Sequence, residues 1–174
     1  MDATRRSVLL GSLGLSAWVH AQEMARAAEP RFDTLDPAMA ADIDALVSHI
    51  IPSADGPGAR EAGVIFFIDR ALGTFDSDKV AVYRTGMAQL QQVRGRMFPT
   101  SVSVAALTPE QQIELLRAIE TTEFFELLRT HTVLGFLGPP SYGGNRGQVG
   151  WKHIGFEHRM AWQPPFGWYD GEGA

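Results

Sequence analysis

Residues whose side chains suit catalysis or metal binding are few in this chain and are spread along it. The sequence holds five histidines and no cysteine, which excludes disulfides, thiolate nucleophiles and cysteine-ligated zinc or iron–sulfur sites. His153 and His158 are five residues apart in a predicted loop, and Glu157 precedes the second. Because a structural metal site needs about four converging ligands, this group does not predict one.

Two further chemistries can be weighed from residue types. His153 with Asp69 or Asp55 would suit a hydrolase, but the chain has no nucleophile on a recognisable strand-to-helix elbow. Gly143 and Gly144 lack the preceding strand and following helix of a phosphate-binding loop. We therefore predict no catalytic, cofactor-binding or metal-binding residue, and any redox centre must belong to a partner or be held by ligands other than cysteine.

The charge balance narrows the choice of partners. The 174 residues carry 15 Lys and Arg against 20 Asp and Glu, a net charge of −5. An acidic chain is poorly suited to the phosphate backbone of nucleic acids or to anionic lipid surfaces. The length fits one domain with a core of its own.

Residues 1–28 have the composition of a signal peptide. Arg5 and Arg6 precede an apolar run from Val8 to Val19 that is too short to span a bilayer. The pair resembles the twin-arginine export signal, which carries folded proteins, and predicts a periplasmic protein. A Sec-type signal or a basic arm is the alternative. Cleavage is compatible with Ala21 and with Ala27 as the last residue removed.

Residues 29–137 are predicted to form a helical domain. Asp36 before Pro37 is an N-cap pattern, and Gly73 is a stop signal for the second helix. The apolar run from Val64 to Ile68 predicts that this second helix is the most buried. Asp76 or Ser77 is predicted to cap the third helix.

The fourth helical stretch has the clearest start. Thr108, Pro109 and Gln111 form a capping-box pattern. The apolar stripe includes Ile113, slips near Thr122, which is a predicted second cap, and resumes to Leu134 before a stop at Gly135. Since no stretch of useful length alternates with period two, the fold class is all-α, an irregular bundle of four to five helices.

Residues 138–174 differ in composition and are predicted to form a long Gly- and aromatic-rich coil. They hold 9 of the 18 Gly and 7 of the 17 aromatic residues. A disordered tail would be poor in aromatics, so these rings are expected to pack on the chain's own helices and on a partner subunit. The partner-binding candidates are Tyr142, Asn145, Trp151, Phe156, Trp162 and Trp168.

Two of these candidates have a second interpretation. Asn145 follows two glycines and is predicted to adopt a left-handed conformation and fix the loop through its side chain. Trp151 is either a core residue over the bundle or a contact with another subunit. We expect it to be mainly core, with Phe156, Trp162 and Trp168 contributing more to partner contact.

Two sequence blocks resemble a known family. The first is Ile51–Ala59 followed by Glu61–Val64 and Phe67–Asp69, and the second is Tyr142–Asn145 followed by Gly150–Phe156. Together with the signal, they resemble the gluconate 2-dehydrogenase subunit 3 family over roughly positions 35 to 156. These proteins are small subunits of bacterial, membrane-associated, FAD-dependent sugar and polyol dehydrogenases. The tail from Glu157 onward lies outside the resemblance.

The resemblance implies a non-catalytic role. In such complexes a large flavoprotein subunit binds FAD and oxidises the substrate, and a cytochrome c subunit commonly passes electrons on; an iron–sulfur cluster or haem would likewise belong to a partner. The small subunit supplies the twin-arginine signal and escorts the folded flavoprotein through the translocation machinery. The alternatives are an independent periplasmic binding or scaffold protein with the same helical fold and, as a third class, a small enzyme.

Overall fold

The structure is a computed structural model that describes residues 31–159 and 161. The chain divides into two units, residues 1–31 and 32–174, and the helices named here belong to the second. Its described residues form helices and no strands, which confirms the all-α class. The α-helices are α2 (Pro37–Ile50), α3 (Val64–Gly73), α4 (Val80–Met97), α5 (Pro109–Ile119), α6 (Glu123–Leu137) and α7 (Val149–His153), and the 3₁₀ helices are η1 (Ser77–Lys79), η2 (Pro140–Tyr142) and η3 (Arg146–Gln148).

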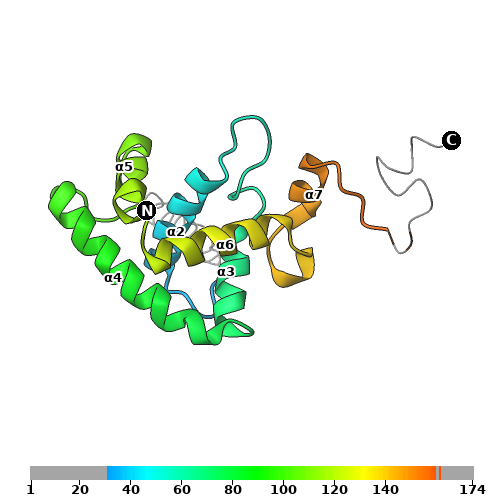
Figure 1. Cartoon of the computed structure of the whole chain (residues 1–174), viewed down its shortest axis with the longest axis horizontal. Coiled ribbons are helices and arrows are strands. Elements are labelled where there is room, and N and C mark those ends of the chain that lie inside the picture. The colour runs from blue at the N-terminus through cyan, green and yellow to red at the C-terminus, as the bar shows by residue number, and fades with distance from the viewer. Residues whose placement is uncertain (1–30, 160, 162–174) are drawn as a thin grey trace, which may run out of the picture. The chain divides into compact units, whose positions relative to one another are not determined.

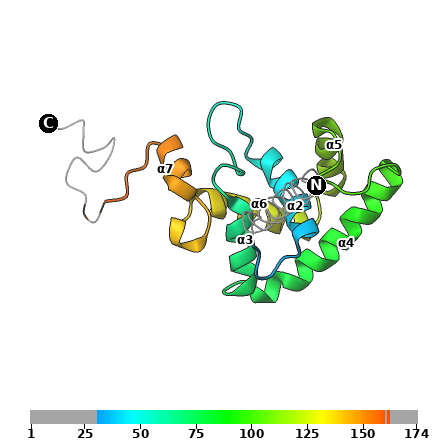
Figure 2. The same cartoon turned by 180° about the vertical axis from the view of Figure 1, so that it is seen from behind.

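Helix α6 is the centre of the bundle. It contacts α2, α3, α4 and α7, and Figure 1 shows it running across the middle of the helices. From behind, the long helix α4 lies along one side with α5 beyond its end (Figure 2). Seven of the ten residues of α3 are buried, as the apolar run from Val64 predicts.

Three predicted caps are confirmed. The Asp36 side chain accepts a hydrogen bond from the Met39 N–H at the start of α2. Thr108 and Gln111 exchange the two hydrogen bonds of a capping box at the start of α5. The Thr122 hydroxyl accepts from the Phe125 N–H, which begins α6 after a break in the helix. These starts depend on local side chains, so the sequence predicts them well.

The start of α4 is predicted wrongly. Neither Asp76 nor Ser77 caps it; η1 intervenes, α4 begins at Val80, and no side chain makes a cap hydrogen bond. Asp76 instead places Oδ2 3.2 Å from Nε2 of His131. The Asp76 carboxylate, which the local pattern predicts as a helix cap, therefore makes a tertiary contact with His131 instead.

The end of α6 and part of the apolar stripe also differ from prediction. The helix continues through Gly135 to Leu137. A side chain on Gly144 would collide with the Gly135 carbonyl, which also accepts the Asn145 N–H at 2.8 Å. Ile113 and Leu134, expected on the buried stripe, are exposed. Gly135 itself packs against Phe67 of α3, and its carbonyl contacts the segment that follows α6.

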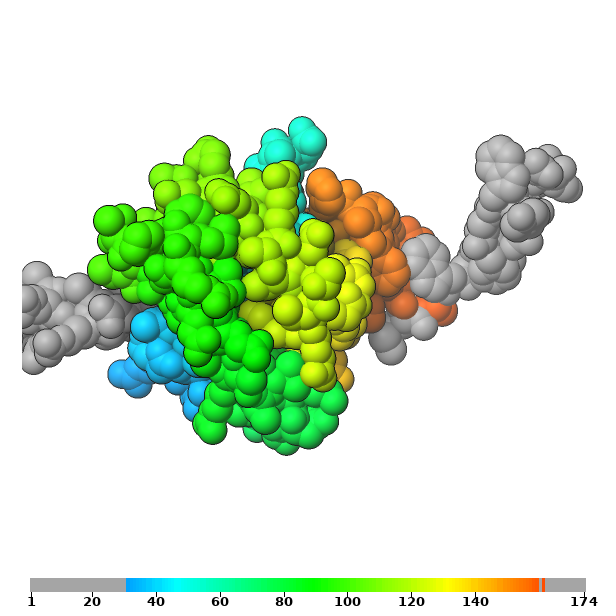
Figure 3. Space-filling model, turned by 60° about the vertical axis from the view of Figure 1, so that its left-hand side comes forward, coloured from blue at the N-terminus to red at the C-terminus, as the bar shows by residue number. Residues whose placement is uncertain are grey.

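The segment after α6 is not all coil. It contains η2, η3 and the five-residue helix α7, which is too short to show a period in sequence. In Figure 3 these orange residues lie against the yellow end of α6. With α7 included, the described residues hold six α-helices, more than the four to five predicted.

Candidate functional site

The residues predicted to form the export signal or to bind a partner fall into two groups. Arg5, Arg6, Trp162 and Trp168 lie outside the described residues. Tyr142, Asn145, Trp151 and Phe156 are described, and all four follow α6. The burial and contacts of these four residues show which act within the fold and which face solvent.

Asn145 acts inside the chain. It is fully buried, with 0% of its surface exposed, and has a left-handed φ of 45°. Its Nδ2 donates to the Gly138 carbonyl at 3.0 Å, and its Oδ1 accepts from the Gly150 N–H at 2.9 Å. These contacts are those of the loop-fixing interpretation; direct contact with a partner would require this loop to open.

Trp151 is mainly a core residue, as expected, with 8% of its surface exposed. Its Nε1–H donates to the Leu137 carbonyl at 2.6 Å, which satisfies a carbonyl at the end of α6. The rings of Phe156 and His158 each lie 5.2 Å from the Trp151 ring. Phe156 itself is exposed, so the outer layer of this cluster faces solvent.

Tyr142 lines an apolar groove that sequence analysis did not find. The groove has a volume of about 390 Å³. Three of its large residues are strongly exposed: Phe75 (53%), Leu134 (47%) and Tyr142 (46%). The Phe75 ring meets the Tyr142 ring edge to face at 5.7 Å and lies 6.1 Å from the Phe67 ring. We call this surface the aromatic groove; it is lined by Phe67, Phe75, Leu134, Gly138, Pro139 and Tyr142.

The groove was missed because its members come from separate places in the chain. Phe75 stands between a helix stop and η1, so it belongs to no periodic pattern. Leu134 has the spacing of a core residue but lies on an exposed face. The useful signal was Tyr142 beside Pro139 and Pro140, which predicts a turn that carries an aromatic ring.

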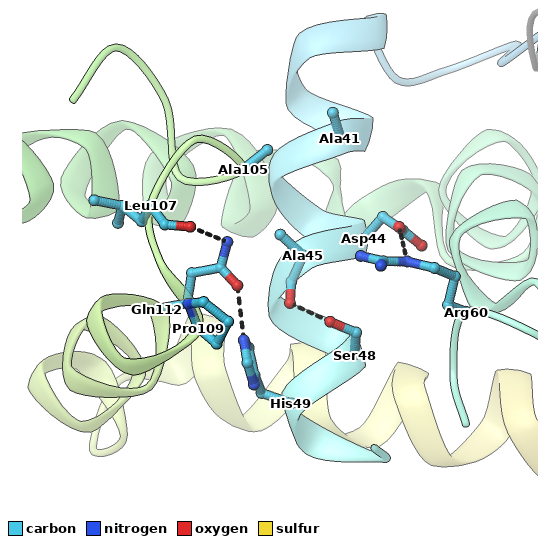
Figure 4. Close-up of a pocket in the computed structure, with 10 residues that line it drawn as sticks. All are labelled: Ala41, Asp44, Ala45, Ser48, His49, Arg60, Ala105, Leu107, Pro109 and Gln112. Carbon is cyan, nitrogen blue, oxygen red and sulfur yellow. Dashed lines mark hydrogen bonds and ion pairs between the residues drawn. The ribbon is translucent and has the colours of Figure 1, made fainter. Parts of the chain in front are cut away.

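A second pocket, which we call the polar pocket for its paired polar side chains, lies between α2 and α5 and mixes polar with apolar lining residues (Figure 4). Its volume is about 450 Å³. Nε2 of His49 lies 2.7 Å from Oε1 of Gln112, whose Nε2 donates to the Leu107 carbonyl at 3.2 Å. On the other side of α2 in Figure 4, Arg60 donates to Asp44 at 2.8 Å. His49 therefore pairs with Gln112, and Arg60 pairs with Asp44.

The buried His131 is also held by its neighbours. The Tyr83 hydroxyl lies 3.0 Å from Nδ1, Asp76 lies 3.2 Å from Nε2, and the Tyr83 ring stacks on the imidazole. Burial lowers the pKa of His131, against the opposing effect of the Asp76 carboxylate. Burial also raises the pKa of Tyr83. A neutral imidazole that accepts from Tyr83 and donates to Asp76 satisfies all three groups, so we assign it a structural role.

Two buried carboxylates bind backbone amides. Asp69 accepts from the N–H groups of Asp33, Thr34 and Leu35 at 2.8–2.9 Å, which fastens the segment before α2 onto α3. Asp42 accepts from the Ala105 N–H at 2.8 Å and from Gln91 at 2.6 Å. Their hydrogen-bonding capacity is therefore used within the fold, and His153 is not the partner of Asp69.

The described part of the chain thus offers surfaces for contact. Within it, no three His, Asp or Glu residues converge as metal ligands, and every buried side-chain nitrogen and oxygen has a hydrogen-bond partner. Nor is any helix of this part long and apolar enough to cross a membrane. The aromatic groove is one exposed apolar feature of this part of the chain.

These features define an all-α protein with an exposed aromatic groove. The family described as gluconate 2-dehydrogenase subunit 3 matches residues 37–157, and the chain belongs to it. The match covers both sequence blocks quoted above and ends before the last residues. Neither the curated proteins nor the solved structures contain a match to the chain.

Proposed function

We propose that this protein is the non-catalytic small subunit of an FAD-dependent sugar or alcohol dehydrogenase complex. The observation that carries the proposal is the family membership over residues 37–157. In support, the buried polar side chains of the described region are used in hydrogen bonds within the fold. FAD belongs to the large flavoprotein subunit in this proposal, and a cytochrome c subunit is a further partner.

The second part of the proposal is an escort role. The signal with Arg5 and Arg6 directs this chain to the twin-arginine route, and the flavoprotein travels with it, already folded, to the periplasm. Membrane association then comes through the complex. An exposed Phe156 beside the Trp151 cluster supports contact with the flavoprotein, because aromatic side chains are frequent anchors in interfaces.

Purification of the tagged full chain from its native host tests the first part. We expect a yellow flavoprotein to copurify and dehydrogenase activity to follow that subunit. The separated small chain should be colourless and inactive with artificial electron acceptors. Turnover by this chain free of flavoprotein would contradict the proposal.

Cell fractionation tests the escort role. The Arg5→Lys and Arg6→Lys double variant should leave both subunits in the cytoplasm, because one signal serves two folded chains. Arg26→Lys, a change of the same kind outside the pair, is the matched control and should leave export intact. A periplasmic flavoprotein in the double variant would rule out the escort role.

A further inference from the structure

We propose that the aromatic groove binds the chain's own C-terminal segment, residues 162–169, in the free subunit. The proposal concerns this chain alone and does not depend on a flavoprotein partner. It departs from the expectation that Trp162 and Trp168 contact another subunit directly. Three properties carry it: the exposed apolar walls of the groove, the composition of the segment, and the place where the described chain ends.

The groove exposes large apolar side chains to solvent. Phe75, Leu134 and Tyr142 are each about half exposed, while Phe67 beneath them is buried. A concave apolar site of about 390 Å³ is within the range that takes up a ligand of several ring-sized groups. A neighbouring set of exposed large hydrophobic residues marks an interaction surface.

The C-terminal segment has the matching chemistry. Residues 162–169 read Trp-Gln-Pro-Pro-Phe-Gly-Trp-Tyr, with four aromatic residues, two prolines and no charge. Consecutive prolines favour an extended polyproline conformation, and grooves lined by aromatic residues recognise such segments. The groove supplies Phe75 and Tyr142 as exposed walls.

The described chain ends close to the groove. His158 stacks on Trp151 at 5.2 Å, and Trp151 donates to the Leu137 carbonyl at 2.6 Å. Gly138 and Pro139, which follow Leu137 directly, line the groove. Trp162 is four positions after His158, a span of at most about 14 Å, which brings the segment within reach. Attachment to the same chain raises its effective concentration at the groove.

Engineered disulfides test the proposal in the full chain purified without flavoprotein, since the native sequence has no cysteine. Leu134→Cys with Gly167→Cys should form an intramolecular disulfide about tenfold faster than Val102→Cys with Gly167→Cys. Val102 is exposed beyond the far end of α4, a helix of about 27 Å that begins near Phe75. Equal rates for the two pairs would overturn the proposal. A disulfide-linked dimer would overturn it by assigning the groove to a second copy.

Proteolysis gives a readout without cysteines. Chymotrypsin should cut after Phe166 and Trp168 about tenfold faster in Leu134→Glu than in the unmodified chain. Ile113→Glu is the matched control, because Ile113 is also an exposed apolar helix residue but lies on α5. Equal cutting in the two variants would contradict the proposal, as would protection of the tail only when flavoprotein is added. Failure to copurify a flavoprotein affects the proposed function and leaves both readouts unchanged.

Discussion

The polar pocket beside α2 and the aromatic groove beside α6 are similar in size, but the pocket contains paired polar side chains among apolar ones and the groove is almost wholly apolar. In the polar pocket, His49 and Gln112 face each other at 2.7 Å and Arg60 pairs with Asp44 at 2.8 Å. In the groove, Phe75, Leu134 and Tyr142 are about half exposed. Polar groups that already pair with each other must break those hydrogen bonds to bind a ligand. Covering exposed rings removes apolar surface from water, which is favourable. This difference favours the groove as the surface at which we propose that the C-terminal segment binds.

The largest effect on the free energy of unfolding is expected at Trp151, a buried residue close to the groove. Trp151→Ala should lower the free energy of unfolding by about 3–5 kcal/mol, because it removes a buried ring and leaves the Leu137 carbonyl without its donor. Tyr142→Ala, at an exposed position, is the control and should cost about 1 kcal/mol or less. Urea unfolding of both variants measures the difference. Similar losses would mean that groove and core are not separable.

Removal of a buried polar side chain should give the next largest effect. Asp69→Ala leaves the N–H groups of Asp33, Thr34 and Leu35 without their acceptor. We expect a loss of about 1–3 kcal/mol in the free energy of unfolding. Asp55→Ala, an exposed loop position, is the matched control. Chemical denaturation of the two variants provides the comparison, and an unchanged Asp69→Ala would contradict the role of this carboxylate.

Acidification should weaken the fold through His131. Burial holds the pKa of His131 below its ordinary value of 6.5, so the unfolded chain takes up this proton at a higher pH than the folded chain. The contribution is fully present above pH 6.5 and is lost as the pH falls toward the folded-state pKa, with a slope of at most about 1.4 kcal/mol per pH unit. Stability curves of wild type and His131→Gln measure it. A slope as steep in the variant as in wild type would contradict this role.

The smallest effect is expected in the polar pocket. Arg60→Ala breaks an ion pair whose arginine side chain is 59% exposed. Exposed pairs contribute about 0–1 kcal/mol, so thermal unfolding should change little. Faster chymotrypsin cutting of the C-terminal segment in Arg60→Ala, with unchanged cutting in Leu134→Glu, would reverse the comparison between the two surfaces.

The sequence predicts those parts of the molecule that neighbouring residues determine. The caps at Asp36, Thr108 and Thr122 each need only residues within one turn, and all three are confirmed. The exposure of Leu134 and the engagement of Asp76 by His131 depend on elements far apart in the chain. Periodicity cannot show which side of α6 the later Gly144 loop covers, so the groove could not be predicted.

The contact between Asp69 and the segment before α2 also bears on how the chain folds. It joins amides of residues 33–35 to a carboxylate more than thirty positions later, so the contact is non-local and its formation closes a long loop. Those three amides should therefore exchange with deuterium only when the segment detaches or α3 opens. The protection of these amides from exchange therefore reports, residue by residue, whether the segment at the start of the helical unit is attached to α3.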